Sequence, residues 1–146
     1  MKRTLNILLT STIFIAFSCH LGDDGQAKRE ELKNIVLEYY NALANKDLPK
    51  ANSLTTDNFV LWDEGRIYNN QVAIDSVKTM GTFTVKFTID SLNVHVDKKN
   101  ASAYYFRNAE FTFPDRVFRP VFLESCTFNK EGSKWKLRFM QSSLRK

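Results

Sequence analysis

Two carboxyl groups lie where the sequence could support proton transfer. Glu124 falls in a predicted strand, between Phe122 and Cys126 of the same side-chain register. An apolar wall of this kind raises the pKa of a carboxyl group, so that the group can donate a hydrogen bond. Asp63 falls in the predicted turn Asp63-Glu64-Gly65, where water keeps a carboxylate ionised. One protonated and one ionised carboxyl group in a single site would support general acid–base chemistry.

Both carboxyl groups also have purely structural interpretations. Glu124 could form an ion pair with Arg107 or Arg119 on a neighbouring strand. Asp63 could do no more than stabilise its turn. The sequence leaves both interpretations open.

Few other residues could bind a metal ion or act as a nucleophile. The only histidines are His20 and His95, which are too few for the ligand cluster that zinc needs. We therefore expect no metal and no cofactor. Cys126 shares an apolar register with Phe128 and is interpreted as a small core residue rather than a nucleophile.

The second half of the chain predicts a sheet that is apolar on both faces. Between residues 101 and 113, Tyr105 and Phe111 occupy one register while Tyr104 and Phe106 occupy the other. A sheet with one face in water should alternate apolar and polar residues, so this one needs cover on both sides. Helices can cover one face, with a pocket beneath them if the sheet curves, and a second copy of the chain is expected on the other. The predicted strands are 83–96, 101–113, 117–128 and 135–143.

The first half predicts helices and a short hairpin. Apolar residues at helical spacing indicate a helix over 27–45. A second, shorter helix begins with Asp47 as its cap and Pro49 in its first turn. A short strand pair follows at 59–62 and 66–68, and then a third helix over 71–80, capped by Asn69 or Asn70. Helices followed by hairpin-connected strands predict an α+β fold with an antiparallel meander.

The N-terminus reads as a targeting segment. Residues 1–19 combine a short basic start, an apolar stretch and a small-residue site that ends at Cys19. The ending resembles a bacterial lipobox, which implies lipidation of Cys19 and a membrane anchor at the cell envelope, in the outer membrane, periplasm or cell surface. An ordinary secretory signal is the alternative. Residues 20–26 are expected to form a flexible tether, and 27–146 a single domain.

The charge of the chain argues against nucleic-acid binding. The net charge is +5, and it falls to +3 without Lys2 and Arg3 of the targeting segment. The remaining lysines are scattered rather than gathered into a stripe. If Cys19 is lipidated, Cys126 has no disulfide partner, so packing must stabilise the domain.

Several short stretches follow one another in a characteristic order along the chain: Tyr40-Asn41-Ala42-Leu43, Lys46-Asp47-Leu48, the run from Phe59 to Gly65, Leu123-Glu124-Ser125 and the run from Lys134 to Ser143. These stretches and the order of the predicted elements resemble the NTF2-like superfamily, in particular SnoaL-like and DUF4440-type domains. This resemblance implies three N-terminal helices packed on a strongly curved antiparallel sheet in the shape of a cone. It also implies a cavity between the two layers and a homodimer across the outer face of the sheet.

The resemblance also suggests roles for individual residues. In the ketosteroid isomerases of this superfamily, a helix tyrosine and a carboxylic acid form an oxyanion hole and an aspartate acts as the base. The corresponding residues here are Tyr40, Glu124 and Asp63. Relatives usually carry histidine where Gln141 stands, and glutamine cannot shuttle a proton near neutral pH. The expected pocket residues are Trp62, Tyr68, Trp135, Gln141 and Ser143, and for the aromatic ones packing in the core is the alternative.

Three functions follow as alternatives. The first is binding of an apolar or aromatic small molecule in the pocket. The second is an isomerase or cyclase that uses Tyr40, Asp63 and Glu124 for proton transfer. The third is an interaction module whose cavity is filled by its own side chains.

Overall fold

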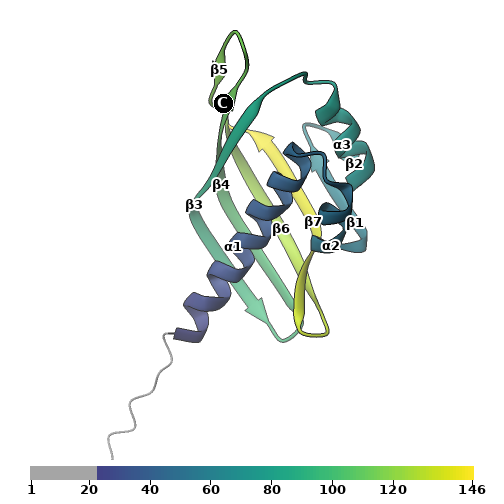
Figure 1. Ribbon diagram of the computed structural model, residues 1–146. Helices are drawn as coiled ribbons and strands as arrows, with labels where there is room; N and C mark the ends of the chain where they lie inside the picture. The colour runs from purple at the N-terminus through teal and green to yellow at the C-terminus, as the bar shows by residue number, and fades with distance from the viewer. Residues whose placement is uncertain (1–22) are drawn as a thin grey trace, which may run out of the picture.

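The computed structural model describes residues 23–146, and three helices lie on the concave side of a curved sheet (Figure 1). The expected signal peptide and Cys19 lie outside these residues. The helices are α1 (Asp23–Ala44), α2 (Leu48–Leu54) and α3 (Asn70–Lys78). The strands are β1 (Thr55–Asp63), β2 (Arg66–Tyr68), β3 (Thr84–Asp97), β4 (Asn100–Thr112), β5 (Val117–Phe118), β6 (Val121–Glu131) and β7 (Lys134–Leu144).

Local signals in the sequence set the starts of the two short helices. The Asp47 carboxylate accepts a hydrogen bond of 3.0 Å from the Lys50 amide, and Pro49 lies in the first turn of α2. The Asn69 side chain caps α3 by accepting 2.9 Å from the Val72 amide. Both caps confirm the predictions, since each satisfies a backbone amide that the helix leaves unpaired. Helix α1 begins at Asp23, so residues 23–26 are helical although a tether was expected there.

The sheet has the strand order β2-β1-β7-β6-β4-β3, with β5 added beside β4. The hairpins β3–β4 and β6–β7 and the β4–β6 pair are antiparallel as predicted, but β1 pairs with β7 in parallel. The sheet is therefore mixed. Parallel neighbours need a long connection, and here the whole meander between β1 and β7 provides it.

A bulge in β7 decides which of its residues face the helices. Phe128 pairs with Leu137, whereas the preceding Thr127 pairs with Phe139, so Arg138 is an extra residue on β7. An extra residue moves every later side chain to the opposite face. Met140 and Ser142 are consequently buried, whereas Gln141 is exposed.

The best-packed part of the core lies under α1. Ala101, Phe128 and Leu137 are neighbours on β4, β6 and β7, followed by the row Ala103, Cys126 and Met140. All six are buried. Cys126 is thus a core residue, and burial raises the pKa of its thiol. This agrees with its interpretation as a small apolar side chain.

The outer face of the sheet mixes large apolar residues with polar ones. Tyr104 is 61% exposed and Leu123 is 51% exposed, and serines and threonines lie between such residues. Within the single chain, the outer face is therefore uncovered. None of the three described helices is both long enough and apolar enough to cross a membrane.

Candidate functional site

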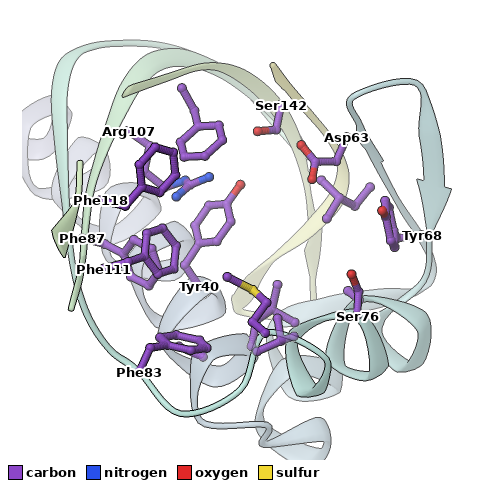
Figure 2. Close-up of a pocket in the computed structure, with 17 residues that line it drawn as sticks. Tyr40, Asp63, Tyr68, Ser76, Phe83, Phe87, Arg107, Phe111, Phe118 and Ser142 are labelled. Carbon is purple, nitrogen blue, oxygen red and sulfur yellow. The ribbon is translucent and has the colours of Figure 1, made fainter. Parts of the chain in front are cut away.

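A cavity of about 260 Å³ opens between α3, the C-terminal end of α1 and the part of the concave face that carries Phe111 and Phe122 (Figure 2). Its walls are mainly apolar. Phenylalanine side chains from the segment before β3 and from β3 to β6 form one side: Phe83, Phe87, Phe111, Phe118 and Phe122. Predominantly apolar walls with a few polar groups are typical of small-molecule sites.

A row of polar side chains separates this cavity from the packed core. Strand pairing places Tyr105 of β4 beside Glu124 of β6, Glu124 beside Ser142 of β7, and Ser142 beside Asp63 of β1. Tyr40 reaches this row from α1. The bulge in β7 is what turns Ser142 inward, so the row depends on one inserted residue.

Glu124 is the centre of the row. Its Oε1 accepts hydrogen bonds from the Tyr40 hydroxyl (2.8 Å), Arg107 Nε (2.8 Å) and the Ser142 hydroxyl (3.0 Å). Glu124 is therefore a hydrogen-bond acceptor here, whereas the resemblance to ketosteroid isomerases implied a donor. The structural alternative, an ion pair with Arg107, is the one that the structure shows.

The Tyr40 hydroxyl faces this carboxylate and remains protonated. Burial, followed by the charge of Glu124, raises the pKa of Tyr40 well above its usual value. The hydroxyl donates to Glu124, while the ring lines the cavity. The second proposed arginine partner, Arg119, instead pairs with Glu110 at 2.7 Å on the surface.

Arg107 is a site residue that the sequence analysis considered only as a partner for Glu124. It is 5% exposed, and its guanidinium carbon lies 3.9 Å from the centre of the Tyr40 ring and 4.1 Å from that of Phe122. Figure 2 shows its nitrogens among the aromatic side chains of the cavity. The signal was present in the sequence, because Arg107 is the one cation in the inward register Ala101, Ala103, Tyr105, Arg107 and Ala109.

Asp63 lines the cavity from the wall opposite Arg107 (Figure 2). Its Oδ1 is buried and has no hydrogen-bond partner among the described residues. Burial raises the pKa of Asp63, and the Ser142 hydroxyl and Arg107 oppose that change only in part. Asp63 is half-buried, whereas Glu124 is completely buried, so Asp63 is the wetter of the two carboxyl groups. It lies in the cavity wall rather than in the turn itself, because β1 continues to Asp63.

The expected pocket residues divide into two groups. Tyr68 lines the cavity, whereas Trp62, Trp135, Gln141 and Ser143 do not. Trp135 is buried in the core beneath α1. The other three border a separate hollow on the outer face.

The bulge explains the corrections at Gln141 and Ser143, whereas Trp62 points outward because it alternates along β1 with Leu61 and Asp63, which face the cavity. Trp62 pairs with Gln141 across β1 and β7, so both side chains point outward. Trp62 is 49% exposed, and its ring meets that of Phe139 edge-on at 5.4 Å. Ser142, which was not among the expected pocket residues, faces inward and lines the cavity.

Comparison with known proteins identifies the fold. The sequence matches no protein-family model and none of the curated proteins. The CaMKII hub homology domain of Chlamydomonas reinhardtii superposes with a TM-score of 0.67 at 18% identity, over 82% of this chain and 99% of that one. A ketosteroid isomerase-like protein from Erwinia carotovora gives 0.62 at 16% identity, over 82% and 97%.

A third solved structure carries the name of the fold. An NTF2-like protein from Cytophaga hutchinsonii superposes with a TM-score of 0.66 at 10% identity, over 81% of this chain and 98% of that one. The architecture is therefore NTF2-like, as the sequence analysis expected, and these low identities establish the fold alone.

Proposed function

We propose that this NTF2-like domain binds a small molecule with an apolar or aromatic body in the cavity beside α3. The observation that carries the proposal is a cavity of about 260 Å³ whose walls are largely phenylalanine and other apolar side chains. A site of this size and character favours small apolar ligands. It also argues against the alternative of a domain whose cavity is filled by its own side chains.

The polar row favours binding over catalysis by the expected trio. The Tyr40 and Ser142 hydroxyls and Arg107 Nε all donate to the same Glu124 oxygen. Tyr40 and Glu124 are thus engaged with each other. Neither is available as the hydrogen-bond donor that an oxyanion hole requires.

The experiment that tests binding compares a variant that fills the cavity with one that does not. Ser76→Phe places a ring in the cavity from α3, whereas Lys78→Phe, two residues along the same helix, lies outside the lining. We expect the fluorescence increase of a naphthalene probe to be lost in the first variant and kept in the second. Equal probe binding by both variants would contradict the proposal.

Native mass spectrometry of the purified wild-type protein would reveal a retained ligand.

Proton transfer by Asp63 is the second candidate function. A buried carboxyl oxygen without a partner, on a cavity wall, is suited to accept a proton from a bound substrate. Tyr40 and Glu124 would then act as positioning residues that hold Arg107. Asp63→Asn should abolish turnover of an enolisable ketone in an isomerase or cyclase reaction, and full activity in that variant would eliminate this function.

We also propose a homodimer across the outer face of the sheet. Exposed Trp62, Tyr104 and Leu123 support it, since large apolar groups gathered on one face commonly mark a contact surface. Light scattering should give twice the monomer mass for wild type. The Leu123→Asp variant should give the monomer mass, because a dimer would bury its charge. A monomeric wild-type protein would refute this proposal.

Anchoring at the cell envelope through a lipidated Cys19 is a further proposal, and its support comes from the sequence of residues 1–19. Two acyl chains on one cysteine would hold the protein stably on a membrane. Cys19→Ser should move the protein from the membrane fraction to the soluble fraction. Continued sedimentation with membranes would count against the anchor.

A further inference from the structure

We infer that the ligand of this cavity carries a carboxylate, which binds to the terminal nitrogens of Arg107 while its apolar body lies between the phenylalanine rings. The inference rests on the proposed function and narrows it to apolar carboxylic acids. It also gives Arg107 a role beyond its ion pair with Glu124.

The guanidinium of Arg107 is only partly used within the protein. Its one hydrogen bond within residues 23–146 is made by Nε to Glu124. No hydrogen bond of the described chain uses Nη1 or Nη2, although the side chain is 94% buried. Neither terminal nitrogen is among the fully buried atoms without a partner, so both still reach open space and are available to a group that enters the cavity.

The surroundings of Arg107 determine the direction from which a partner can come. The rings of Tyr40 and Phe122 lie on the guanidinium at 3.9 Å and 4.1 Å, and both also line the cavity. The planar faces are therefore occupied, whereas the edge that carries the terminal nitrogens lies toward the cavity (Figure 2). An approach to this edge, in the plane of the group, suits two parallel hydrogen bonds to a carboxylate.

The ion pair with Glu124 is itself incomplete. Only Oε1 of Glu124 meets Arg107, and Oε2 is buried without a partner among the described residues. A purely structural arginine–glutamate pair would gain from a two-pronged contact through both oxygens. The single contact leaves the end of the guanidinium open.

One acidic side chain faces Arg107 across the cavity. Asp63 lies opposite Arg107, and burial raises the pKa of its carboxyl group. This shift favours the neutral form, which would not repel a carboxylate and could donate a hydrogen bond to it. The remaining lining residues carry no charge.

The test uses matched acids and amides with the full-length protein. Calorimetry would measure binding of 2-naphthoate against 2-naphthamide, and of decanoate against decanamide. Each pair shares its apolar body and differs in the charge. We expect the acids to bind about 10- to 100-fold more tightly, since hydrogen bonds to charged groups differ from neutral ones by this order.

Three variants assign the preference to Arg107. Arg107→Met alone would leave Glu124 as an unpaired buried charge, so the informative variant is the double change Arg107→Met with Glu124→Gln. It should bind acid and amide with similar affinity. Glu124→Gln alone keeps Arg107 and removes a negative neighbour, so its preference for the acid should be kept or increased. Arg107→Lys should lose most of the preference for the acid. An ammonium group that contacts Glu124 cannot also present two parallel N–H donors to a ligand carboxylate.

Each outcome decides between the inference and the proposed function. Acids and amides that bind equally to the wild type would overturn the carboxylate inference but leave the cavity as a binding site. A preference that persists in the double variant would also overturn the inference, because the carboxylate would then bind elsewhere. If no member of either pair binds the wild type, the inference and the proposed function both fail.

Discussion

The two halves of the concave face are built on the same strands and differ in what covers them. In the half beneath α1, Phe128 and Leu137 are completely buried. In the half beyond the C-terminal end of α1, Phe118 is 50% exposed and Phe111 lines an open cavity. Strand sequence alone therefore does not decide between core and pocket. The length of α1 does, because the helix ends before the strands do (Figure 1).

The polar row lies at the boundary between these halves. Below it, Ala101 on β4 pairs with Phe128 on β6 and Ala103 pairs with Cys126, and all four are buried as in a close-packed core. Above it, large aromatic side chains on both strands stand around empty space. Glu124 on β6 and Arg107 on β4 lie at the boundary between the close-packed half and the half around the cavity. The buried ion pair thus puts charged side chains, rather than apolar ones, at the boundary between the core and the cavity.

A truncation in each half should separate stability from binding most clearly. Phe128→Ala should cost about 3–5 kcal/mol of unfolding free energy, because it opens a hole in a region without room to relax. Phe118→Ala should cost less than about 1 kcal/mol but weaken binding of a naphthalene probe. Urea denaturation and probe titration measure the two effects. Equal losses of stability would show that both halves are packed alike.

Removing the carboxylate of Glu124 should lower the free energy of unfolding by about as much as a truncation in the core. Glu124→Leu leaves Arg107 buried without a counter-charge, at an expected cost of about 3–5 kcal/mol. The double variant Arg107→Met with Glu124→Gln should unfold at a higher urea concentration than Glu124→Leu, since no unpaired charge remains. If the single variant were the more stable of the two, the row would have no role in holding the boundary.

Asp63 provides the smallest and most specific test, through pH. Burial raises its pKa in the folded protein above the unfolded value, so its contribution to stability is present at low pH and lost as pH rises through the folded pKa. Relative to Asp63→Asn, the wild type should therefore lose a little stability between pH 4 and pH 7. Urea midpoints at the two pH values measure the difference. An unchanged difference between wild type and variant would indicate a hydrated Asp63, and a gain by the wild type would indicate a carboxylate stabilised by a partner such as Arg107; either result would contradict the raised pKa.

Local signals accounted for most of the fold. Asp47 and Asn69 cap helices where the sequence predicted, because capping depends on residues within three positions. The hairpin strands were also found within a few residues of their predicted bounds, apart from the strand expected at 117–128, which is interrupted at Arg119 and Pro120. The parallel β1–β7 pair depends on contacts between distant segments, so no local pattern indicates it.

The site was harder to predict than the fold, for a reason that can be traced to Arg138. Its insertion in β7 exchanges the faces of the residues that follow it. Gln141 and Ser143, expected in the pocket, consequently face outward, and Ser142 takes their place. Tyr40 and Asp63 do line the cavity, whereas Trp62, the neighbour of Asp63 on β1, faces outward. The open edge of Arg107 depends on the packing of two rings from other elements, which no spacing rule describes.

The most direct test of the cavity as a ligand site is a crystal structure of the complex with 2-naphthoate. The account predicts the naphthalene rings among Phe87, Phe111 and Phe122, with the carboxylate on the terminal nitrogens of Arg107. A cavity closed by Phe83 and Phe118, with the probe absent or bound only in the outer hollow beside Trp62, would contradict it.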